Sequence, residues 1–205
     1  MLLDVQDSQL LLIDYQTRLM PAIFEGPQVV ANAVRLARVA ALLKVPGWAT
    51  EENPEGLGGT APELLAHIEA ARGRVLPKMQ FSAVADGLAE ALRPAAKPAQ
   101  AGNARSLPKH LQKPAQAAPQ RSTIVIAGCE SHVCMMQTAL DLLDEEFDVV
   151  VVTDASSSRT ERNRDAAFDR LAGAGAELVT TEMVAFEWLR GADHPQFKAV
   201  LDIVR

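Results

Sequence analysis

The stretches Thr-Ile-Val-Ile-Ala (residues 123–127) and Asp-Val-Val-Val-Val (residues 148–152) decide the fold class. Both are apolar and β-branched at consecutive rather than alternate positions, which is typical of strands buried on both faces of a parallel sheet. The residues between them, 131–146, are expected to form a helix. A strand, a helix and a second strand in succession predict a right-handed βαβ unit.

The same alternation extends outward in both directions. On the N-terminal side we predict strands at residues 9–13, 47–50 and 74–77 and an amphipathic helix at 29–43. On the C-terminal side a helix over 161–173 leads into a strand at 176–180. Repeated strand–helix alternation predicts an α/β protein with three layers.

Three predicted helices begin with capping signals. Thr60 and Glu63 have the spacing of a capping box that follows a polar, glycine-rich loop over 51–59. Ser131 and Thr160 are the expected N-caps of the two helices that follow the strongest strands.

Length and composition favour one globular domain that spans residues 1–205, with 48% hydrophobic and 22% charged residues. Twenty basic and 26 acidic side chains leave a net charge of −6. This balance argues against a nucleic-acid partner, since a basic face supplies most of that affinity. We therefore expect a small-molecule substrate.

Neither a membrane segment nor a secretory leader is expected. The longest apolar runs, 10–13 and 149–152, are far too short to cross a bilayer. Asp4 and Asp7 interrupt the N-terminal apolar residues. With only two cysteines the chain has no disulfide framework, so we expect a cytoplasmic protein without membrane partners.

Residues 94–120 depart from the strand–helix rhythm. They are rich in alanine, proline and glutamine and contain basic but no acidic side chains. We interpret them as an insertion before the fourth strand, on the surface or at a subunit contact.

Three reactive side chains follow three different predicted strands. Asp14 ends the first strand, Lys78 follows the third, and Cys134 lies shortly after the fourth. Ligands of open parallel sheets bind at the carboxyl ends of the strands. Each residue alone also has a simpler structural interpretation: Asp14 as a turn cap, Lys78 as a solvated lysine and Cys134 as an inert buried thiol.

The position of Cys134 favours a catalytic role over that of an inert buried thiol. It lies in the first turn of a predicted helix, where free N–H groups lower a thiol pKa and stabilise an oxyanion. Asp14 is then a candidate general base, and Lys78 a candidate partner for the developing charges.

At this point the sequence resembles the isochorismatase-like cysteine hydrolases. The resemblance runs from about residue 10 to 205, apart from the insertion, and the tail at 194–198 resembles the isochorismatase-domain-containing subgroup. Its elements are Leu-Ile-Asp-Tyr-Gln (12–16), Thr-Glu-Glu-Asn-Pro (50–54), Gly-Leu-Gly (56–58), Lys-Met-Gln-Phe-Ser (78–82), Gly-Cys-Glu-Ser-His-Val-Cys (128–134), Thr-Ala (138–139), Asp-Ala-Ser-Ser-Ser-Arg (154–159) and His-Pro-Gln-Phe-Lys (194–198).

The resemblance implies a catalytic triad of Asp14, Lys78 and Cys134. The thiolate would attack an amide carbonyl, and water would resolve the thioester. A non-proline cis peptide would fall at Cys129–Glu130, and the backbone N–H groups of Glu130 and Cys134 would form the oxyanion hole. Relatives are usually oligomers, so a homo-oligomer of two or more copies is expected.

The expected fold is a three-layer α/β/α, Rossmann-like domain with a mostly parallel six-stranded sheet in the order 3-2-1-4-5-6. Gln16, Glu52 and Phe81 lie on loops expected to line the substrate pocket. The Asp-x-His metal motif of nicotinamidases is missing after the second strand. We therefore expect neither a metal nor another cofactor.

The leading hypothesis is a metal-independent cysteine hydrolase that cleaves a small amide-type C–N bond. One alternative is a catalytically quiet binding protein with the same fold. Another is a redox-sensing protein that uses Cys129 and Cys134. Both Asp14 and Lys78 favour the hydrolase, since neither alternative needs them.

Overall fold

The computed structural model describes residues 2–71, 73–93 and 121–205. The insertion expected at 94–120 falls outside these ranges, so its position stays a prediction. Among the described residues, no helix combines the length and the apolar composition needed to span a bilayer.

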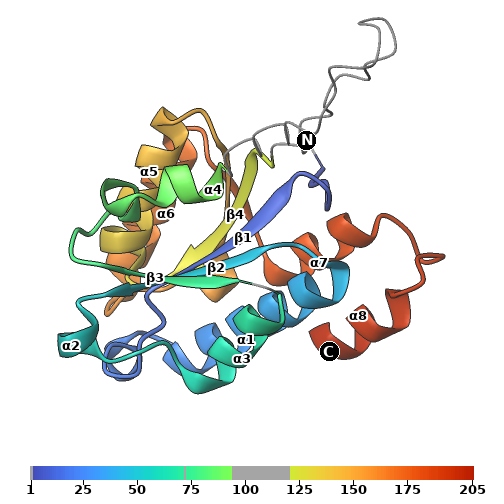
Figure 1. Cartoon of the computed structure of the whole chain (residues 1–205), viewed down its shortest axis with the longest axis horizontal. Helices are drawn as coiled ribbons and strands as arrows, with labels where there is room; N and C mark the ends of the chain where they lie inside the picture. The colour runs from blue at the N-terminus through green and yellow to red at the C-terminus, as the bar shows by residue number, and fades with distance from the viewer. Residues whose placement is uncertain (1, 72, 94–120) are drawn as a thin grey trace, which may run out of the picture.

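A six-stranded sheet forms the centre of the molecule, in the order β3-β2-β1-β4-β5-β6 (Figure 1). Each pairing between neighbouring strands is parallel. The strands are β1 (Ser8–Ile13), β2 (Gly47–Glu52), β3 (Arg74–Lys78), β4 (Thr123–Gly128), β5 (Asp148–Val152) and β6 (Glu177–Val179). The predicted fold class and strand order are confirmed.

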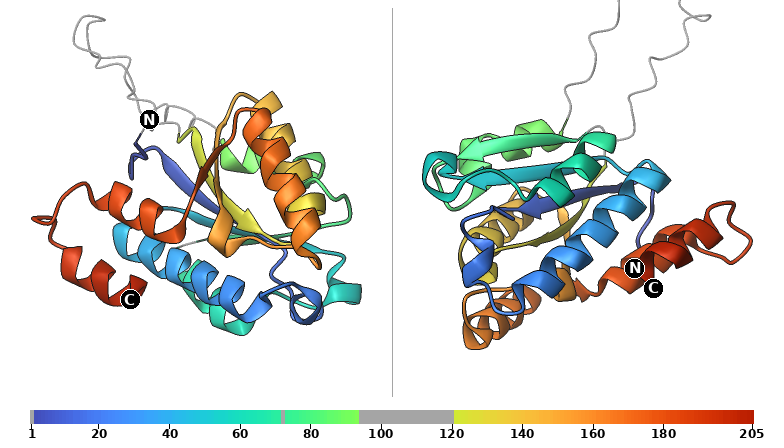
Figure 2. Two further views of the ribbon diagram at one scale, coloured as in Figure 1. Left: turned by 180° about the vertical axis from the view of Figure 1, so that it is seen from behind. Right: turned by 90° about the horizontal axis from the view of Figure 1, so that it is seen from below.

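Helices cover both faces of the sheet (Figures 1 and 2). One face carries α1 (Gly26–Leu43), α3 (Pro62–Ala70), α7 (Thr181–Leu189) and α8 (Phe197–Val204), and the other carries α4 (Leu88–Leu92), α5 (Met136–Asp144) and α6 (Glu161–Gly173). Shorter segments are η1 (Met20–Ala22), α2 (Pro54–Leu57), η2 (Ala83–Asp86), the π-helical turn η5 (Ser131–Met135) and η6 (Thr153–Ala155).

Strand β1 shows why its residues are apolar without alternation. Leu10 and Leu12 pack into the core under α1, whereas Leu11 and Ile13 pack into the core under α5. All four side chains are at most 1% exposed. Burial on both faces removes the solvent-facing positions that would otherwise be polar.

Two of the three predicted N-cap residues do not cap a helix. Pro62 begins α3 without a side-chain cap, because Thr60 instead donates its N–H and hydroxyl to Oε1 of Glu51, at 2.7 and 2.8 Å. The Ser131 hydroxyl caps no helix and is buried without a hydrogen-bond partner among the described residues. Thr160 does cap α6 by accepting from the Asn163 N–H, as predicted.

The order of the strands reverses between β1 and β4, and this position locates the candidate site. Neighbouring crossovers leave in opposite directions here, which opens a crevice at the carboxyl ends of these two strands. Gly128 at the end of β4 lies so close to Ile13 that a β-carbon would fall 2.5 Å from the Ile13 carbonyl oxygen. Glycine therefore permits the close approach of the two strand ends.

Candidate active site

Asp14 lies directly after β1 and adopts a left-handed conformation with φ of 55°. Left-handed backbone is uncommon in residues other than glycine and often marks functional positions. Its side chain is fully buried, and Oδ1 accepts a 2.6 Å hydrogen bond from the Thr50 hydroxyl on β2. The carboxylate is therefore held by the neighbouring strand.

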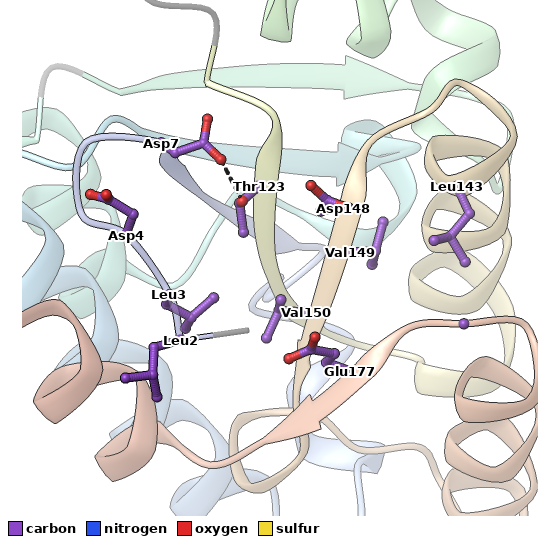
Figure 3. A pocket seen from close by; sticks show the side chains of 11 residues that line it. Leu2, Leu3, Asp4, Asp7, Thr123, Leu143, Asp148, Val149, Val150 and Glu177 are labelled. Carbon is purple, nitrogen blue, oxygen red and sulfur yellow. Dashed lines mark hydrogen bonds between the residues drawn. The ribbon is translucent and has the colours of Figure 1, made fainter.

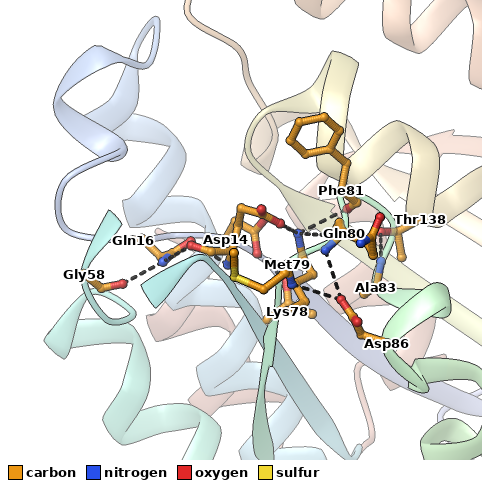
Figure 4. A network of polar contacts seen from close by, with 12 residues as sticks. Asp14, Gln16, Gly58, Lys78, Met79, Gln80, Phe81, Ala83, Asp86 and Thr138 are labelled. Atoms are coloured by element: carbon orange, nitrogen blue, oxygen red, sulfur yellow. Dashed lines mark hydrogen bonds and ion pairs between the residues drawn. The ribbon is translucent and has the colours of Figure 1, made fainter. Parts of the chain in front are cut away.

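Lys78 ends β3 and brings its ammonium to the same place (Figure 4). Nζ lies 2.8 Å from Oδ2 of Asp14 and 2.7 Å from Oε2 of Glu52. The backbone carbonyls of Gln80 and Phe81 accept from it at 3.3 and 3.1 Å. The Lys78 side chain is fully buried, so its charge is balanced by these partners rather than by water.

The surroundings keep Lys78 protonated. Burial acts to lower the pKa of this ammonium, but the charge of Asp14 and the hydrogen bonds to Asp14 and Glu52 more than offset it and raise the pKa above its usual value. Lys78 is therefore a fixed positive charge in the site and not a proton acceptor.

Cys134 approaches the same point from the turn after β4. It lies in η5 and is 6% exposed. Its Sγ, an Asp14 carboxylate oxygen and a Glu52 carboxylate oxygen all lie within 4.8 Å of one another. The tertiary structure thus brings together the three residues predicted as a triad, from the ends of three strands.

The expected lowering of the Cys134 pKa by the helix start is not what these surroundings produce. Burial raises the pKa of this thiol, and Asp14 raises it further through its charge and as a hydrogen-bond acceptor. Lys78 opposes the rise, but Glu52 adds to it. Cys134 is accordingly a thiol at rest, next to a carboxylate that can take its proton.

The backbone before Cys134 has the predicted arrangement at Cys129–Glu130, whose peptide bond is cis. The N–H of Glu130 has no acceptor among the described residues, which leaves it free to bind an oxyanion. The following N–H, that of Ser131, donates to the Ser157 carbonyl at 2.8 Å.

Arg159 is a residue whose role the sequence analysis missed. Its guanidinium binds the carboxylate of Glu130, with Nη2 2.6 Å from Oε1, and its backbone N–H donates to Oε2 at 2.8 Å. These bonds lower the pKa of Glu130 against the effect of burial. The signal available in the sequence was the run of three serines before Arg159, all of which are buried beside the nucleophile turn.

Glu52 and Gln16 were both expected on pocket loops; Gln16 does lie on the loop after β1, whereas Glu52 lies in a strand. Glu52 is the last residue of β2 and stands opposite Lys78 in the strand register. Gln16 is fully buried. Its side chain donates to the carbonyls of Glu52 and Gly58 at 2.9 and 2.6 Å and accepts from the Glu52 N–H at 2.9 Å. Gln16 therefore positions Glu52, and its expected contact with the substrate stays a prediction.

Phe81 and His132 border the site in different ways. The Phe81 side chain is 53% exposed and extends away from the ion pairs in Figure 4, and its expected contact with the substrate stays a prediction. His132 directs its ring nitrogens to Ser158 and Asn163, at 2.9 and 3.3 Å. It makes no Cys–His pair with Cys134.

Asp14, Glu52 and Cys134 are also the one group of three possible metal ligands found among the described residues. The Lys78 ammonium already lies within 2.8 Å of both carboxylates. The positive charge that a metal ion would supply between them is thus provided by the protein.

A separate cavity lies at the opposite edge of the sheet (Figure 3). Asp7, Thr123 and Asp148 line it near the beginning of their strands, and Asp7 accepts a 2.7 Å hydrogen bond from Thr123. None of the triad residues borders this cavity.

Comparison with known proteins gives consistent relatives. The family model of the isochorismatase domain matches residues 107–183. Isochorismatase domain-containing protein 2A of Mus musculus is 36% identical over 200 residues, covering 98% of this chain and 84% of that protein.

Solved structures are similar over almost the whole chain. MAR1 ribonuclease from Caenorhabditis elegans has a TM-score of 0.82 at 29% identity, covering 98% of this chain and 91% of that one. YcaC from Pseudomonas aeruginosa, with hexane-2,5-diol and covalent acrylamide, has 0.77 at 28%, covering 98% and 90%. YcaC from Escherichia coli, described as an octameric hydrolase of unknown specificity, has 0.77 at 27%, covering 97% and 86%. The chain therefore belongs to the isochorismatase domain family, in the subgroup of the isochorismatase domain-containing proteins.

Proposed function

We propose that this protein is a metal-independent cysteine hydrolase that cleaves a small amide-type C–N bond through a thioester. The observation that carries the proposal is the fully buried ion pair of Asp14 and Lys78, 2.8 Å apart, with the Cys134 thiol close to the same carboxylate. A charged pair without access to water is costly to bury and needs a reason to be there.

In the first half of the reaction, Asp14 accepts the Cys134 proton while Sγ attacks the substrate carbonyl carbon. The oxyanion accepts hydrogen bonds from the backbone N–H groups of Glu130 and Cys134. Asp14 then returns the proton to the leaving nitrogen as the C–N bond breaks. Ammonia or an amine leaves, and an acyl group remains on sulfur.

In the second half, water attacks the thioester carbon and gives a proton to Asp14. The carbon–sulfur bond breaks, the sulfur regains that proton, and a carboxylic acid is released. Lys78 keeps a positive charge beside Asp14 through both halves of the reaction, and this charge also stabilises the negative charge that develops on sulfur.

The relatives support a hydrolase without naming the substrate. The Escherichia coli YcaC structure is described as a hydrolase of unknown specificity. The Pseudomonas aeruginosa YcaC structure contains covalent acrylamide, an electrophile that adds to a nucleophile and keeps its amide bond. Two carboxylates beside the thiol would repel a phosphodiester, which argues against the ribonuclease activity that the name of the Caenorhabditis elegans structure carries.

The redox alternative has less support than the hydrolase. Cys129 is fully buried in the core cluster under α1, whereas Cys134 packs in the cluster under α5. Burial raises the pKa of Cys129 to about 12. A resolving thiol needs access and thiolate character, and Cys129 has neither.

The proposal includes a homo-oligomer in a reducing, cytoplasmic setting. The Escherichia coli YcaC structure is an octamer, and both cysteines of this chain are unpaired. Light scattering on the purified full chain measures the number of copies, and a monomer at micromolar concentration would contradict this part.

Ammonia release from a panel of small amides, ureides and carbamoyl compounds tests the reaction. We expect release by the wild type and by Cys129→Ala, none by Cys134→Ala, and no effect of a chelator. Ammonia release that survives in Cys134→Ala would show that Cys134 is not the nucleophile. Loss of release upon chelation would contradict metal independence. No release from any compound would favour the quiet binding protein.

A further inference from the structure

Glu52 places a second negative charge in the site, which the triad chemistry does not use. Its carboxylate and that of Asp14 share the single ammonium of Lys78. Two carboxylates and one ammonium leave one negative charge beside a neutral thiol. The nearby Glu130 carboxylate is already neutralised by Arg159.

The structure holds Glu52 in place and leaves part of it available. Gln16 binds both the N–H and the carbonyl of its backbone, each at 2.9 Å. Oε2 accepts from Lys78 at 2.7 Å, whereas Oε1 has no hydrogen-bond partner among the described residues. The side chain is 12% exposed, so a ligand can reach an otherwise buried acceptor.

The distance to the nucleophile limits where such a ligand group can lie. A Glu52 carboxylate oxygen is within 4.8 Å of Cys134 Sγ. A carbonyl carbon poised for attack lies about 3–3.5 Å from sulfur, and a charged N–H donor lies about 2.8 Å from its acceptor. A nitrogen on the carbon next to the carbonyl satisfies both distances.

We propose that Glu52 is a specificity-determining residue that selects small amides carrying a positively charged nitrogen, such as an ammonium group, next to the scissile carbonyl. This inference rests on the proposed hydrolase function and names the substrate class of that site. The charge-assisted hydrogen bond and the uncompensated negative charge favour the cation. The same charge disfavours an anionic group at that position.

A bound cation would also assist the reaction at sulfur. The Glu52 charge is one of the causes that raise the pKa of the Cys134 thiol. A positive group on Glu52 offsets that charge and eases removal of the thiol proton. The correct substrate thus promotes formation of its own nucleophile.

Matched amides of similar size and different charge test the selection. Glycinamide carries an ammonium group, propionamide is neutral, and malonamate is an anion. We expect the wild type to prefer glycinamide over propionamide in kcat/KM and to reject malonamate. In Glu52→Gln, which keeps the size and an acceptor oxygen, the preference falls by about tenfold or more.

Two variants serve as controls. Glu52→Asp keeps the charge and should retain the preference for the cation. Glu55→Gln makes the same change of charge at an exposed position of α2 and should leave the preference unaltered. An unchanged ratio in a folded Glu52→Gln protein, verified by a cooperative melt, would overturn the inference.

A second measurement does not depend on turnover. The Cys134 sulfur attacks an alkyl methanethiosulfonate, forms a mixed disulfide and releases methanesulfinate. We compare the rates for the cationic trimethylammonium-ethyl reagent and the anionic sulfonatoethyl reagent by mass spectrometry. We expect the wild type to react faster with the cation, and the rate ratio to fall in Glu52→Gln.

The two measurements separate failure of the inference from failure of the proposed function. Amide hydrolysis with an unchanged charge preference in Glu52→Gln leaves the hydrolase intact and overturns the role of Glu52. A charge preference of Cys134 modification that depends on Glu52, without hydrolysis of any amide, overturns the hydrolase and supports Glu52 as a cation-binding residue.

Discussion

Thr50 donates a 2.6 Å hydrogen bond from its hydroxyl to Oδ1 of Asp14, and both side chains belong to fully buried residues. Oδ2 of the same carboxylate faces Lys78 at 2.8 Å. One oxygen is thus fixed by a neutral donor from β2 and the other by a cation from β3. The carboxylate proposed as the general base is therefore held between two strands before any substrate arrives.

Thr50→Val should lower kcat/KM by about tenfold, or about 1.4 kcal/mol, because one hydrogen bond that orients the base is lost. Thr50→Ser keeps the hydroxyl and should retain most of the activity. Equal losses in both variants would indicate a packing defect at this buried position and not a positioning role.

Asp14→Asn should reduce kcat/KM by about 10²–10⁴, the usual contribution of a general base. The fold should persist, because Lys78 keeps its 2.7 Å contact with Glu52. Asp144→Asn, an exposed change of the same kind at the end of α5, is the control. Activity within about threefold of the wild type in Asp14→Asn would assign the base to another group.

Lys78→Met should destabilise the protein by about 3–5 kcal/mol at neutral pH, because two buried carboxylates lose their shared cation. The double variant Lys78→Met/Glu52→Gln should recover part of that loss in urea unfolding.

The ion pairs of Lys78 should make the stability of the protein fall at alkaline pH. The folded-state pKa of Lys78 is raised above its usual 10.5, so its stabilising effect is present below that pH and is lost as the pH rises through the folded value. Lys78→Met should lack this alkaline loss, and an identical alkaline profile in both proteins would contradict the ion pair.

Alkylation by iodoacetamide should modify Cys134 and spare Cys129 in the folded protein. The rate should still rise at pH 9, since the pKa of Cys134 is raised above its usual 9.0. Cys129 is fully buried, with a pKa of about 12. Peptide mass mapping distinguishes the two sites.

Two charge variants should move the Cys134 alkylation rate in opposite directions at any one pH below its pKa. Glu52→Gln removes a charge that raises the pKa and should accelerate the reaction, whereas Lys78→Met removes one that lowers it and should slow the reaction. Shifts in the same direction would show that these charges do not control the thiol.

Arg159→Ala should make the protein more sensitive to acid. Arg159 lowers the pKa of Glu130 below its usual 4.5, so the stabilisation is present above that value and disappears as the pH falls through the folded pKa. Without Arg159, unfolding should begin at a higher pH.

The control for this effect is Arg162→Ala, which removes an equal charge from an exposed position of α6. Equal acid midpoints in the two variants would show that net charge, and not the pair with Glu130, sets the sensitivity.

The chain itself determined the sheet and the positions of its reactive groups. Consecutive apolar residues in β1, β4 and β5 can be buried only between two layers of helices. Strand ends then locate Asp14, Lys78 and Cys134 at one edge, since parallel strands share a direction. Such features follow from local composition and from topology.

Only the tertiary structure decided how those groups interact. Glu52 was expected on a loop, but β2 continues through it because its backbone pairs with Lys78 in β3 and is held by Gln16. Thr60 was expected to cap a helix, but it binds Glu51.

Each of these contacts joins residues far apart in sequence or depends on which of several partners comes within reach. The pKa of Cys134 shows the consequence, because a local helix start predicted a lowered value, whereas burial and the charge of Asp14 raise it. Burial and distance enter the free energy only after the chain has packed, and a sequence pattern contains neither.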